Sequence, residues 1–211
     1  MTTRAAAIKS GYTSGARMLA ARSVLGLART RITPNALTAS GVSLCAAASA
    51  LVLFEDRNQI LFYWLAALVF VVGSLLDILD GALARAGGKT TRFGAYLDST
   101  TDRISEGFML TALAYVLARD HHPIFVAVVM AAVAGSFLVS YTRAKAEALG
   151  LRGDVGIGSR AERVVVITAG LVLAPWGVLP WALALLACTA WITVAQRVLH
   201  VRKQLMEAEN S

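Results

Sequence analysis

Four aspartates stand in a short, mostly apolar stretch of the sequence. Asp77 and Asp80 are three residues apart, and Asp98 and Asp102 are four residues apart. Side chains at these spacings share one face of a helix. Carboxylates packed together repel one another unless protons or cations neutralise them, and an all-oxygen ligand set suits Mg²⁺, Mn²⁺ or Ca²⁺ better than zinc. The stretch therefore predicts a metal site, and four aspartates around two ions would suit phosphoryl transfer.

Two apolar segments must position these aspartates. The first pair falls towards the end of segment 60–84, and the second pair falls near the start of segment 95–118. Because a short connection makes consecutive helices antiparallel, we expect both pairs at one level, facing each other. Gly81 and Gly94 leave room for a close approach, and Arg85 suits phosphate oxygens. Charged groups within membrane helices are costly and usually mark function.

The composition predicts an all-α polytopic membrane protein surrounded by membrane lipids. Of the 211 residues, 57% are hydrophobic and 16% are charged, and the mean hydropathy is +0.63. A soluble domain carries about 25% charged residues. Spans of about 20 apolar residues are needed to cross a bilayer. We predict six transmembrane helices, at about 36–54, 60–84, 95–118, 123–146, 163–176 and 180–200. The fifth is short if it stops at Pro175.

Three regions follow from this pattern. Residues 1–33 alternate basic and apolar positions, which predicts an N-terminal amphipathic cytoplasmic segment lying as a helix on the membrane surface. Residues 34–203 form the predicted six-helix transmembrane domain. Residues 204–211 form a predicted cytoplasmic tail.

The basic residues predict the orientation of the chain. With the N-terminus inside, only Arg57 and Arg119 of the 20 lysines and arginines fall in exterior segments. The chain is therefore expected to be a multi-pass protein of the cell (plasma) membrane. Both termini and the acidic site are expected on the cytoplasmic side. The net charge of +7 is then a topology signal, and no nucleic-acid partner is predicted.

A cation- or proton-coupled membrane transporter is the alternative of a different class, because transporters also carry intramembrane carboxylates. Transport favours acidic residues near the middle of a span, whereas these lie near the cytoplasmic ends. The sequence also shows no inverted repeat. An enzyme is therefore the favoured interpretation.

The residues from Asp77 to Asp102 fit D-x2-D-G-x2-A-R-x8-G-x3-D-x3-D, which resembles the signature of the CDP-alcohol phosphotransferases. The resemblance implies six transmembrane helices, a homodimer and a site for two Mg²⁺ ions, with Mn²⁺ possible. It also implies that Asp77, Asp80, Asp98 and Asp102 hold the metals and that Asp102 is the general base. The deprotonated acceptor would attack the β-phosphorus of the CDP-lipid in line, and CMP would leave.

The same resemblance implies the contacts of the CDP-lipid. Taken alone, Thr33-Pro34-Asn35 is a helix-start signal. Within the family, the matching positions hold the nucleotide and the pyrophosphate. They are Pro34, Asn35, Thr38, Gly81, Arg85 and Thr91.

The later part of the chain bears on the acceptor. Residues 140–148, 150–154, 160–163 and 196–197 resemble the phosphatidylinositol phosphate synthases of actinobacteria, a group within the family. This implies transfer from CDP-diacylglycerol to inositol 1-phosphate (1D-myo-inositol 3-phosphate), giving phosphatidylinositol phosphate and CMP. A phosphorylated acceptor needs a cationic pocket, and basic residues at the cytoplasmic ends of three spans could supply one: Arg143, Lys145, Arg160, Arg163 and Arg197. The resemblance assigns Arg143, Lys145, Arg160 and Arg197 to the acceptor phosphate.

One departure keeps alternatives open. Arg143 precedes Lys145 here, whereas the group has Lys and then Arg, and the two side chains are not equivalent in phosphate recognition. Phosphatidylglycerophosphate synthase is one alternative, because glycerol 3-phosphate also presents a phosphate. Archaetidylinositol phosphate synthase is another, because it shares much of the pattern. The glycine-rich residues 153–158 predict a flexible cytoplasmic turn.

Overall fold

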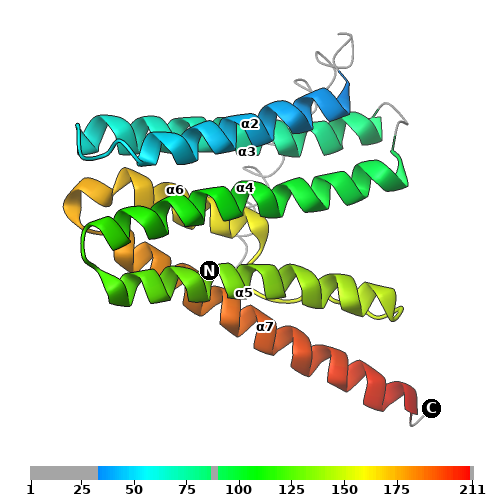
Figure 1. Ribbon diagram of the computed structural model, residues 1–211. Helices are drawn as coiled ribbons and strands as arrows, with labels where there is room; N and C mark the ends of the chain where they lie inside the picture. Colours follow the sequence, from blue (N-terminus) through cyan, green and yellow to red (C-terminus); the bar gives the residue numbers. More distant parts are fainter. Residues whose placement is uncertain (1–32, 87–89, 210–211) are drawn as a thin grey trace, which may run out of the picture. The chain divides into compact units, whose positions relative to one another are not determined.

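The computed structural model describes residues 33–86 and 90–209, without the side chains of residues 34, 85, 86 and 209. All regular structure in these residues is helical (Figure 1). In chain order, the elements are α2 (Pro34–Val52), α3 (Gln59–Ala86), α4 (Arg92–Arg119), α5 (Pro123–Ala148), α6 (Arg160–Val172), the 3₁₀ turn η1 (Ala174–Trp176) and α7 (Leu179–Glu209). The all-α prediction is confirmed. α7 extends to Glu209, past residue 204, where the tail was predicted to begin.

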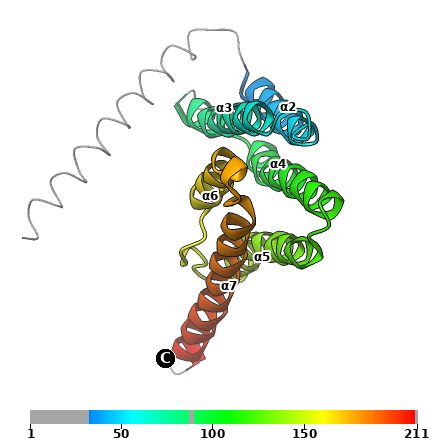
Figure 2. The same ribbon diagram turned by 90° about the vertical axis from the view of Figure 1, so that its left-hand side faces the viewer.

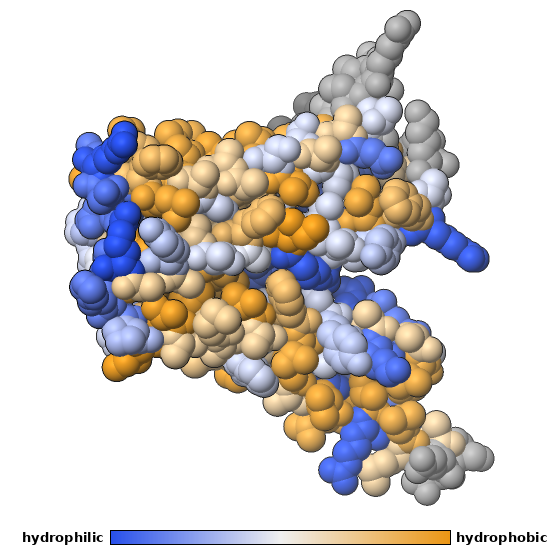
Figure 3. Space-filling model, viewed as in Figure 1, coloured by the Kyte–Doolittle hydropathy of each residue, from blue (hydrophilic) through white to orange (hydrophobic). Residues whose placement is uncertain are grey.

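Four helices are long and apolar enough to cross a membrane. The candidate spans are Asn35–Val52, Gln59–Ala84, Pro123–Ala148 and Leu179–Ala208. They match the first, second, fourth and sixth predicted spans. Large apolar side chains are exposed along these helices, as Figure 3 shows by its hydropathy colours. A lipid environment would cover such a surface, so the chain is a multi-pass membrane protein.

The other two predicted spans differ from these four. The N-terminal part of α4 carries charged side chains, among them Asp98, Asp102 and Glu106. α6 has 13 residues, which at about 1.5 Å per residue is shorter than the ~30 Å hydrocarbon core of a bilayer. The count of six transmembrane helices therefore stays a prediction. The predicted amphipathic helix within 1–33 lies outside the described residues, apart from Thr33.

The described residues fall into two compact units. The first contains residues 33–43 and 72–102, and the second contains residues 44–71 and 103–209. In the first unit, α2 and α3 approach closely at Gly41. A Cβ atom there would lie 2.9 Å from the carbonyl oxygen of Gly73 and 3.5 Å from Cβ of Asp77. This glycine contact sets how Asp77 is held against α2.

Threonines precede both helices that begin in the first unit. The N–H of Ala36 donates to Oγ1 of Thr33 at 3.2 Å, at the start of α2. The N–H of Gly94 donates to Oγ1 of Thr91 at 2.9 Å, at the start of α4. Each hydroxyl thus accepts from a backbone N–H in the first turn of its helix, as helix-capping side chains do.

The second unit has an apolar core to which α4, α6 and α7 contribute fully buried side chains, such as Leu113, Leu171 and Leu186. α5 and α7 lie side by side, as Figures 1 and 2 both show. Gly135 permits this contact, because a Cβ atom there would lie 2.9 Å from Cβ of Ala190. Small residues allow such close packing of membrane helices.

Residues 151–158, which we call the strap, connect α5 to α6 and follow α7 in the opposite direction. Three contacts hold it on α7. The backbone of Arg152 exchanges hydrogen bonds of 3.0 and 2.8 Å with the side-chain amide of Gln204. The carbonyl of Val155 accepts from Nε of Arg197 at 2.8 Å, and the N–H of Gly158 donates to Oγ1 of Thr193 at 2.8 Å. Contacts at 152, 155 and 158 thus meet α7 at 204, 197 and 193.

The flexibility of this turn stays a prediction, whereas its glycines serve close packing in the structure. A Cβ atom on Gly153 would lie 2.9 Å from Cβ of Ala146 on α5. Gly156 has a φ of +120°, and a Cβ atom there would lie 2.3 Å from Cγ2 of Thr193 on α7. Any side chain would therefore push the strap away from one of these helices.

Candidate active site

Three carboxylates of the first unit form a potential metal-binding group. Asp77 of α3 and Asp98 and Asp102 of α4 each place one oxygen within 4.8 Å of the others. Asp77 is buried, and the two others are half-buried. The one-turn spacing of Asp98 and Asp102 puts both on the face of α4 that meets Asp77. Three hard oxygen donors at this separation fit Mg²⁺ or Mn²⁺.

Asp80 takes a different position from the other three aspartates. It is buried, and one of its oxygens accepts a hydrogen bond from Oγ1 of Thr38 on α2. It lines a pocket and is not one of the three carboxylates grouped above. The structure therefore brings three of the four predicted metal ligands together and places the fourth in the adjoining pocket, which Asp98 also lines.

The pocket has a volume of about 390 Å³ and lies where α2 and α4 begin and α3 ends. Its lining residues are Thr33, Asn35, Thr38, Asp80, Gly81, Ala84, Thr90, Thr91, Gly94, Ala95 and Asp98. The N-terminus of a helix carries a partial positive charge and backbone donors, which favour anions such as phosphates. Two helix starts and several hydroxyls beside carboxylates suit a diphosphate held near a metal ion.

Four of the six residues predicted to bind the CDP-lipid line this pocket: Asn35, Thr38, Gly81 and Thr91. Pro34 is the first residue of α2, and Arg85 lies four residues after Gly81 on α3. The side chains of both lie outside the described part of the structure. The pocket is thus built from the segments that the sequence pattern singled out.

The predicted acceptor-phosphate residues all belong to the second unit. Arg197 is buried, and its Nε and Nη1 donate to the carbonyls of Val155 and Val139. Its Nη2 has no hydrogen-bond partner among the described residues. Arg143 is half-exposed and pairs with Glu147 at 2.8 Å.

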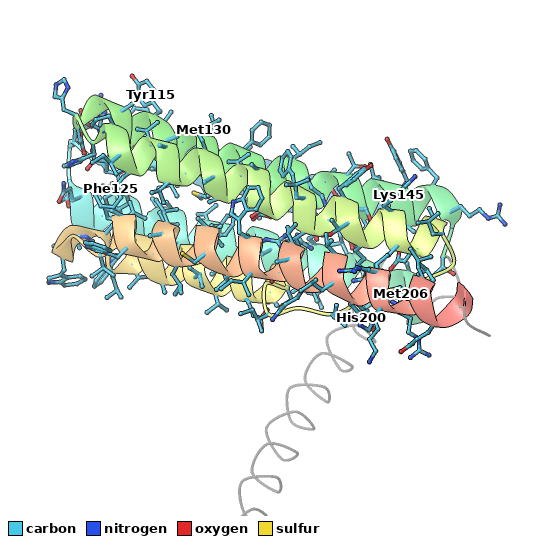
Figure 4. The ribbon with its side chains drawn as sticks, turned by 90° about the horizontal axis from the view of Figure 1, so that it is seen from below. Tyr115, Phe125, Met130, Lys145, His200 and Met206 are labelled. Carbon is cyan, nitrogen blue, oxygen red and sulfur yellow. The ribbon has the colours of Figure 1, made fainter. Side chains whose placement is uncertain are left out.

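The remaining acceptor residues are Lys145 and Arg160. Figure 4 shows Lys145 near the C-terminal end of α5, where it is exposed. Arg160 is the first residue of α6 and follows the cap residue Ser159. Charges from α5 and α6 also reach Arg197, because Arg143 and Arg163 both act on it electrostatically. The second unit therefore gathers cationic side chains from three helices.

A buried ion pair in the second unit was missed by the sequence analysis. Nε and Nη2 of Arg163 donate to the two oxygens of Glu106 at 2.8 and 2.9 Å, and Nη1 donates to the carbonyl of Gly158 at 2.9 Å. Arg163 was grouped with the basic residues only by charge. Glu106 follows Asp102 by about one helical turn on α4, and its partner lies 57 residues later in the chain.

A second buried glutamate of the same unit also pairs with an arginine. Glu55, in the turn after α2, is 3% exposed and bonds to Arg119 at the end of α4. Arg119 also donates to the carbonyl of Leu53 at 3.2 Å. This pair closes the connection between α2 and α3.

A multi-pass helical protein with a carboxylate group beside an anion-favouring pocket has the parts of a membrane-embedded phosphotransferase. The comparisons with known proteins agree. The model of the family described as CDP-alcohol phosphatidyltransferase matches residues 31–196. The chain belongs to this family. It is an enzyme that transfers phosphorus-containing groups, and the transporter alternative is not supported.

Relatives and solved structures narrow the similarity further. The phosphatidylinositol phosphate synthase of Mycobacterium marinum is 40% identical over 185 residues, covering 83% of this chain and 76% of the relative. The archaetidylinositol phosphate synthase of Pyrococcus horikoshii is 38% identical over 182 residues, covering 85% and 88%. The crystal structure of the Mycobacterium tuberculosis phosphatidylinositol phosphate synthase with CDP-DAG bound matches with a TM-score of 0.75 and 34% identity, covering 87% of this chain and 94% of that one. The same mycobacterial protein has been solved in complex with manganese and citrate, with a TM-score of 0.74.

Proposed function

We propose that this enzyme transfers the phosphatidyl group of CDP-diacylglycerol to inositol 1-phosphate, giving phosphatidylinositol phosphate and CMP. The observation that carries the proposal is the group of Asp77, Asp98 and Asp102 beside a pocket at two helix starts. The names of the mycobacterial relatives support the choice of donor and acceptor. The basic residues of the second unit support an acceptor that itself carries a phosphate.

Divalent cations fit the carboxylate group, and two Mg²⁺ ions are the proposed cofactor, with Mn²⁺ as a substitute. Asp77, Asp98 and Asp102 would hold them, with Asp80 contributing from the pocket. When bound, such ions stabilise the negative charge that develops on phosphate oxygens. The manganese complex of the mycobacterial relative supports this choice of metal.

The chain's own groups have distinct roles in the proposed reaction. The helix starts at Asn35 and Thr91 hold the diphosphate of the donor. Asp102 accepts the proton of the acceptor hydroxyl, and the oxygen then bonds to the β-phosphorus of the donor. The bond from this phosphorus to the bridging oxygen breaks, and the electron pair leaves with CMP.

The acceptor phosphate is proposed to bind Arg143, Lys145, Arg160 and Arg197. Arg197 can do so through Nη2, since backbone carbonyls already hold its other two nitrogens. Arg143 would exchange Glu147 for the phosphate, and this exposed pair costs little to open. The order of Arg143 and Lys145 is compatible with binding of the acceptor phosphate if both side chains reach it.

Two related activities are second candidates within the family. Archaetidylinositol phosphate synthesis is favoured by the 38% identity to the Pyrococcus horikoshii enzyme, and it differs in the hydrophobic chains of the donor. Phosphatidylglycerophosphate synthesis would use the same basic residues, because glycerol 3-phosphate also carries a phosphate. Both keep the carboxylate chemistry and change one substrate.

The arrangement in the membrane is also proposed. α4 and α6 complete six spans, both termini and the active site face the cytoplasm, and the enzyme is a homodimer. The concentration of basic residues in the interior segments supports this orientation. Residues 1–33 are proposed to lie along the membrane surface.

The decisive experiment measures CMP release by the purified enzyme with Mg²⁺ and CDP-diacylglycerol. Inositol 1-phosphate, free inositol and glycerol 3-phosphate are compared as acceptors, and CDP-archaeol is compared as donor. We expect release with inositol 1-phosphate and none above background with free inositol. Release only with glycerol 3-phosphate would refute the proposed acceptor, and a strong preference for CDP-archaeol would refute the proposed donor.

A further inference from the structure

The buried pair of Glu106 and Arg163 has a geometry that ties up every nitrogen of the guanidinium. Nε and Nη2 each donate to one oxygen of Glu106, and Nη1 donates to the carbonyl of Gly158. The two side chains are 9% and 6% exposed. Ionisable groups within membrane helices are rare, and they usually pair with one another and mark function.

This pair holds one end of the strap. Gly158 is fixed twice, because its carbonyl accepts from Arg163 and its N–H donates to Thr193 of α7. The next residues are Ser159, which caps α6, and Arg160, its first residue. The position of Arg160 therefore depends on how firmly Gly158 is held.

The other anchor of the strap is itself a proposed acceptor ligand. Nε of Arg197 donates to the carbonyl of Val155, three residues before Gly158. Two arginines thus hold two carbonyls of one short segment, and the segment in turn orients the guanidinium of Arg197. A loosened strap would disturb Arg160 and Arg197 together.

A stabilising role alone does not account for such a pair. Charges removed from water lose hydration, and apolar residues of similar volume often replace a buried pair without loss of stability. A bidentate pair does fix direction, because both oxygens of the carboxylate and the plane of the guanidinium are constrained.

We propose that Glu106 and Arg163 are positioning residues for acceptor recognition, which hold the strap and the first turn of α6 so that Arg160 and Arg197 meet the acceptor phosphate in one fixed arrangement. This inference rests on the proposed function only in that the acceptor carries a phosphate. It applies equally to inositol 1-phosphate and to glycerol 3-phosphate.

The test uses two variants of the full-length enzyme in lipid vesicles. Glu106→Gln keeps the shape of the side chain and removes its charge. The double variant Glu106→Met with Arg163→Met replaces the pair with flexible apolar side chains, so it preserves folding if the single variant does not. For each, kcat and both KM values are measured by CMP release with the phosphorylated acceptor that the wild type uses.

The matched control is Glu55→Gln. It makes the same chemical change at a buried glutamate of the same unit that also pairs with an arginine. Hydrogen–deuterium exchange of residues 151–163 is followed in every variant, because the Gly158 N–H reports whether the strap has loosened.

We expect the KM for the acceptor to rise at least tenfold in both Glu106 variants, with kcat and the KM for CDP-diacylglycerol within twofold of wild type. Exchange in the strap should become faster, and Glu55→Gln should change neither the acceptor KM nor strap exchange.

Faster exchange with an unchanged acceptor KM would overturn the proposal and leave the proposed function intact. An equal rise of both KM values, or the same rise in Glu55→Gln, would also overturn it, since it would indicate a general loss of structure. A wild-type enzyme that uses only glycerol 3-phosphate would refute the proposed acceptor without affecting this test.

Discussion

Replacing Asp98 with asparagine should change thermal stability in opposite directions with and without divalent metal. Oxygens of Asp77, Asp98 and Asp102 lie within 4.8 Å of one another. Two unit charges at that distance repel by about 3.5 kcal/mol at an effective dielectric constant of about 20. Solvent and side-chain rotation reduce this at the half-buried Asp98 and Asp102, so we expect Asp98→Asn to relieve about 1–2 kcal/mol in metal-free enzyme. For a chain of this length, each kcal/mol corresponds to a Tm change of about 2–4 °C.

Divalent metal should reverse the order of the two Tm values, so that the wild type becomes more stable than Asp98→Asn. Saturation at about 100 times the Kd stabilises a protein by about 2.7 kcal/mol, and Asp98→Asn loses one of the three grouped carboxylates. The wild type should therefore gain several degrees with Mg²⁺ or Mn²⁺, while the variant gains little. The assay is thermal unfolding in detergent, with EDTA and then with increasing metal. Asp56→Asn is the matched control, because Asp56 is exposed and lies outside the group.

The crossing of the two Tm curves is what tests the metal site. A variant less stable than wild type in EDTA would show that the carboxylates are not held in mutual repulsion. An equal metal-induced shift in both proteins would show that Asp98 is not a metal ligand. Neither result depends on which alcohol the enzyme uses.

Three further predictions concern single positions. Asp102→Asn should abolish CMP release while CDP-diacylglycerol binding, followed by calorimetry, stays near wild type; normal turnover would remove Asp102 from the role of base. Gly41→Ala should destabilise the enzyme by about 1–3 kcal/mol and lower CMP release, because the new Cβ atom meets a backbone oxygen of α3 at 2.9 Å. Gly107→Ala is its control, since the nearest atom is at 3.7 Å and helix propensity improves; equal Tm values for the two would contradict the packing argument. Hydrogen bonds from the backbone N–H and the side chain of Ser159 lower the pKa of Glu162. The ionised carboxylate of Glu162 therefore adds stability at neutral pH, and this stability is lost as the pH falls through the lowered pKa. Glu162→Gln should therefore lower the Tm at neutral pH, and a Tm difference that persists in acid would argue against the capping carboxylate.

Much of the fold follows from local signals in the sequence. Pro34 and Pro123 begin α2 and α5, and the long apolar runs of α2, α3, α5 and α7 exceed what a soluble helix needs. α6 is harder to predict, because it ends at Val172 and a 3₁₀ turn containing Pro175 follows. Hydropathy alone cannot tell such a short helix from a buried connection.

The candidate site also contains residues that could be predicted from the sequence and residues that could not. Asp77, Asp98 and Asp102 were predictable, because helical spacing on two consecutive helices dictates that they meet. Asp80 was placed with them by spacing, although its hydrogen bond with Thr38 draws it towards the pocket. The pairing of Glu106 was not predictable, because Arg163 lies 57 residues later and no local pattern links the two.

The strap should make the link between α5 and α6 resistant to proteases. Trypsin needs several residues of detached, extended chain around its cleavage site, and exposed loops are normally cut first. Arg152 is exposed, but its backbone is bonded to Gln204, and the residues after it are held by Arg197 and Thr193. Cleavage at this arginine therefore requires the whole segment to leave α7. The rate at which trypsin cuts there measures how often the connection opens, and any ligand that tightens it should slow the cut.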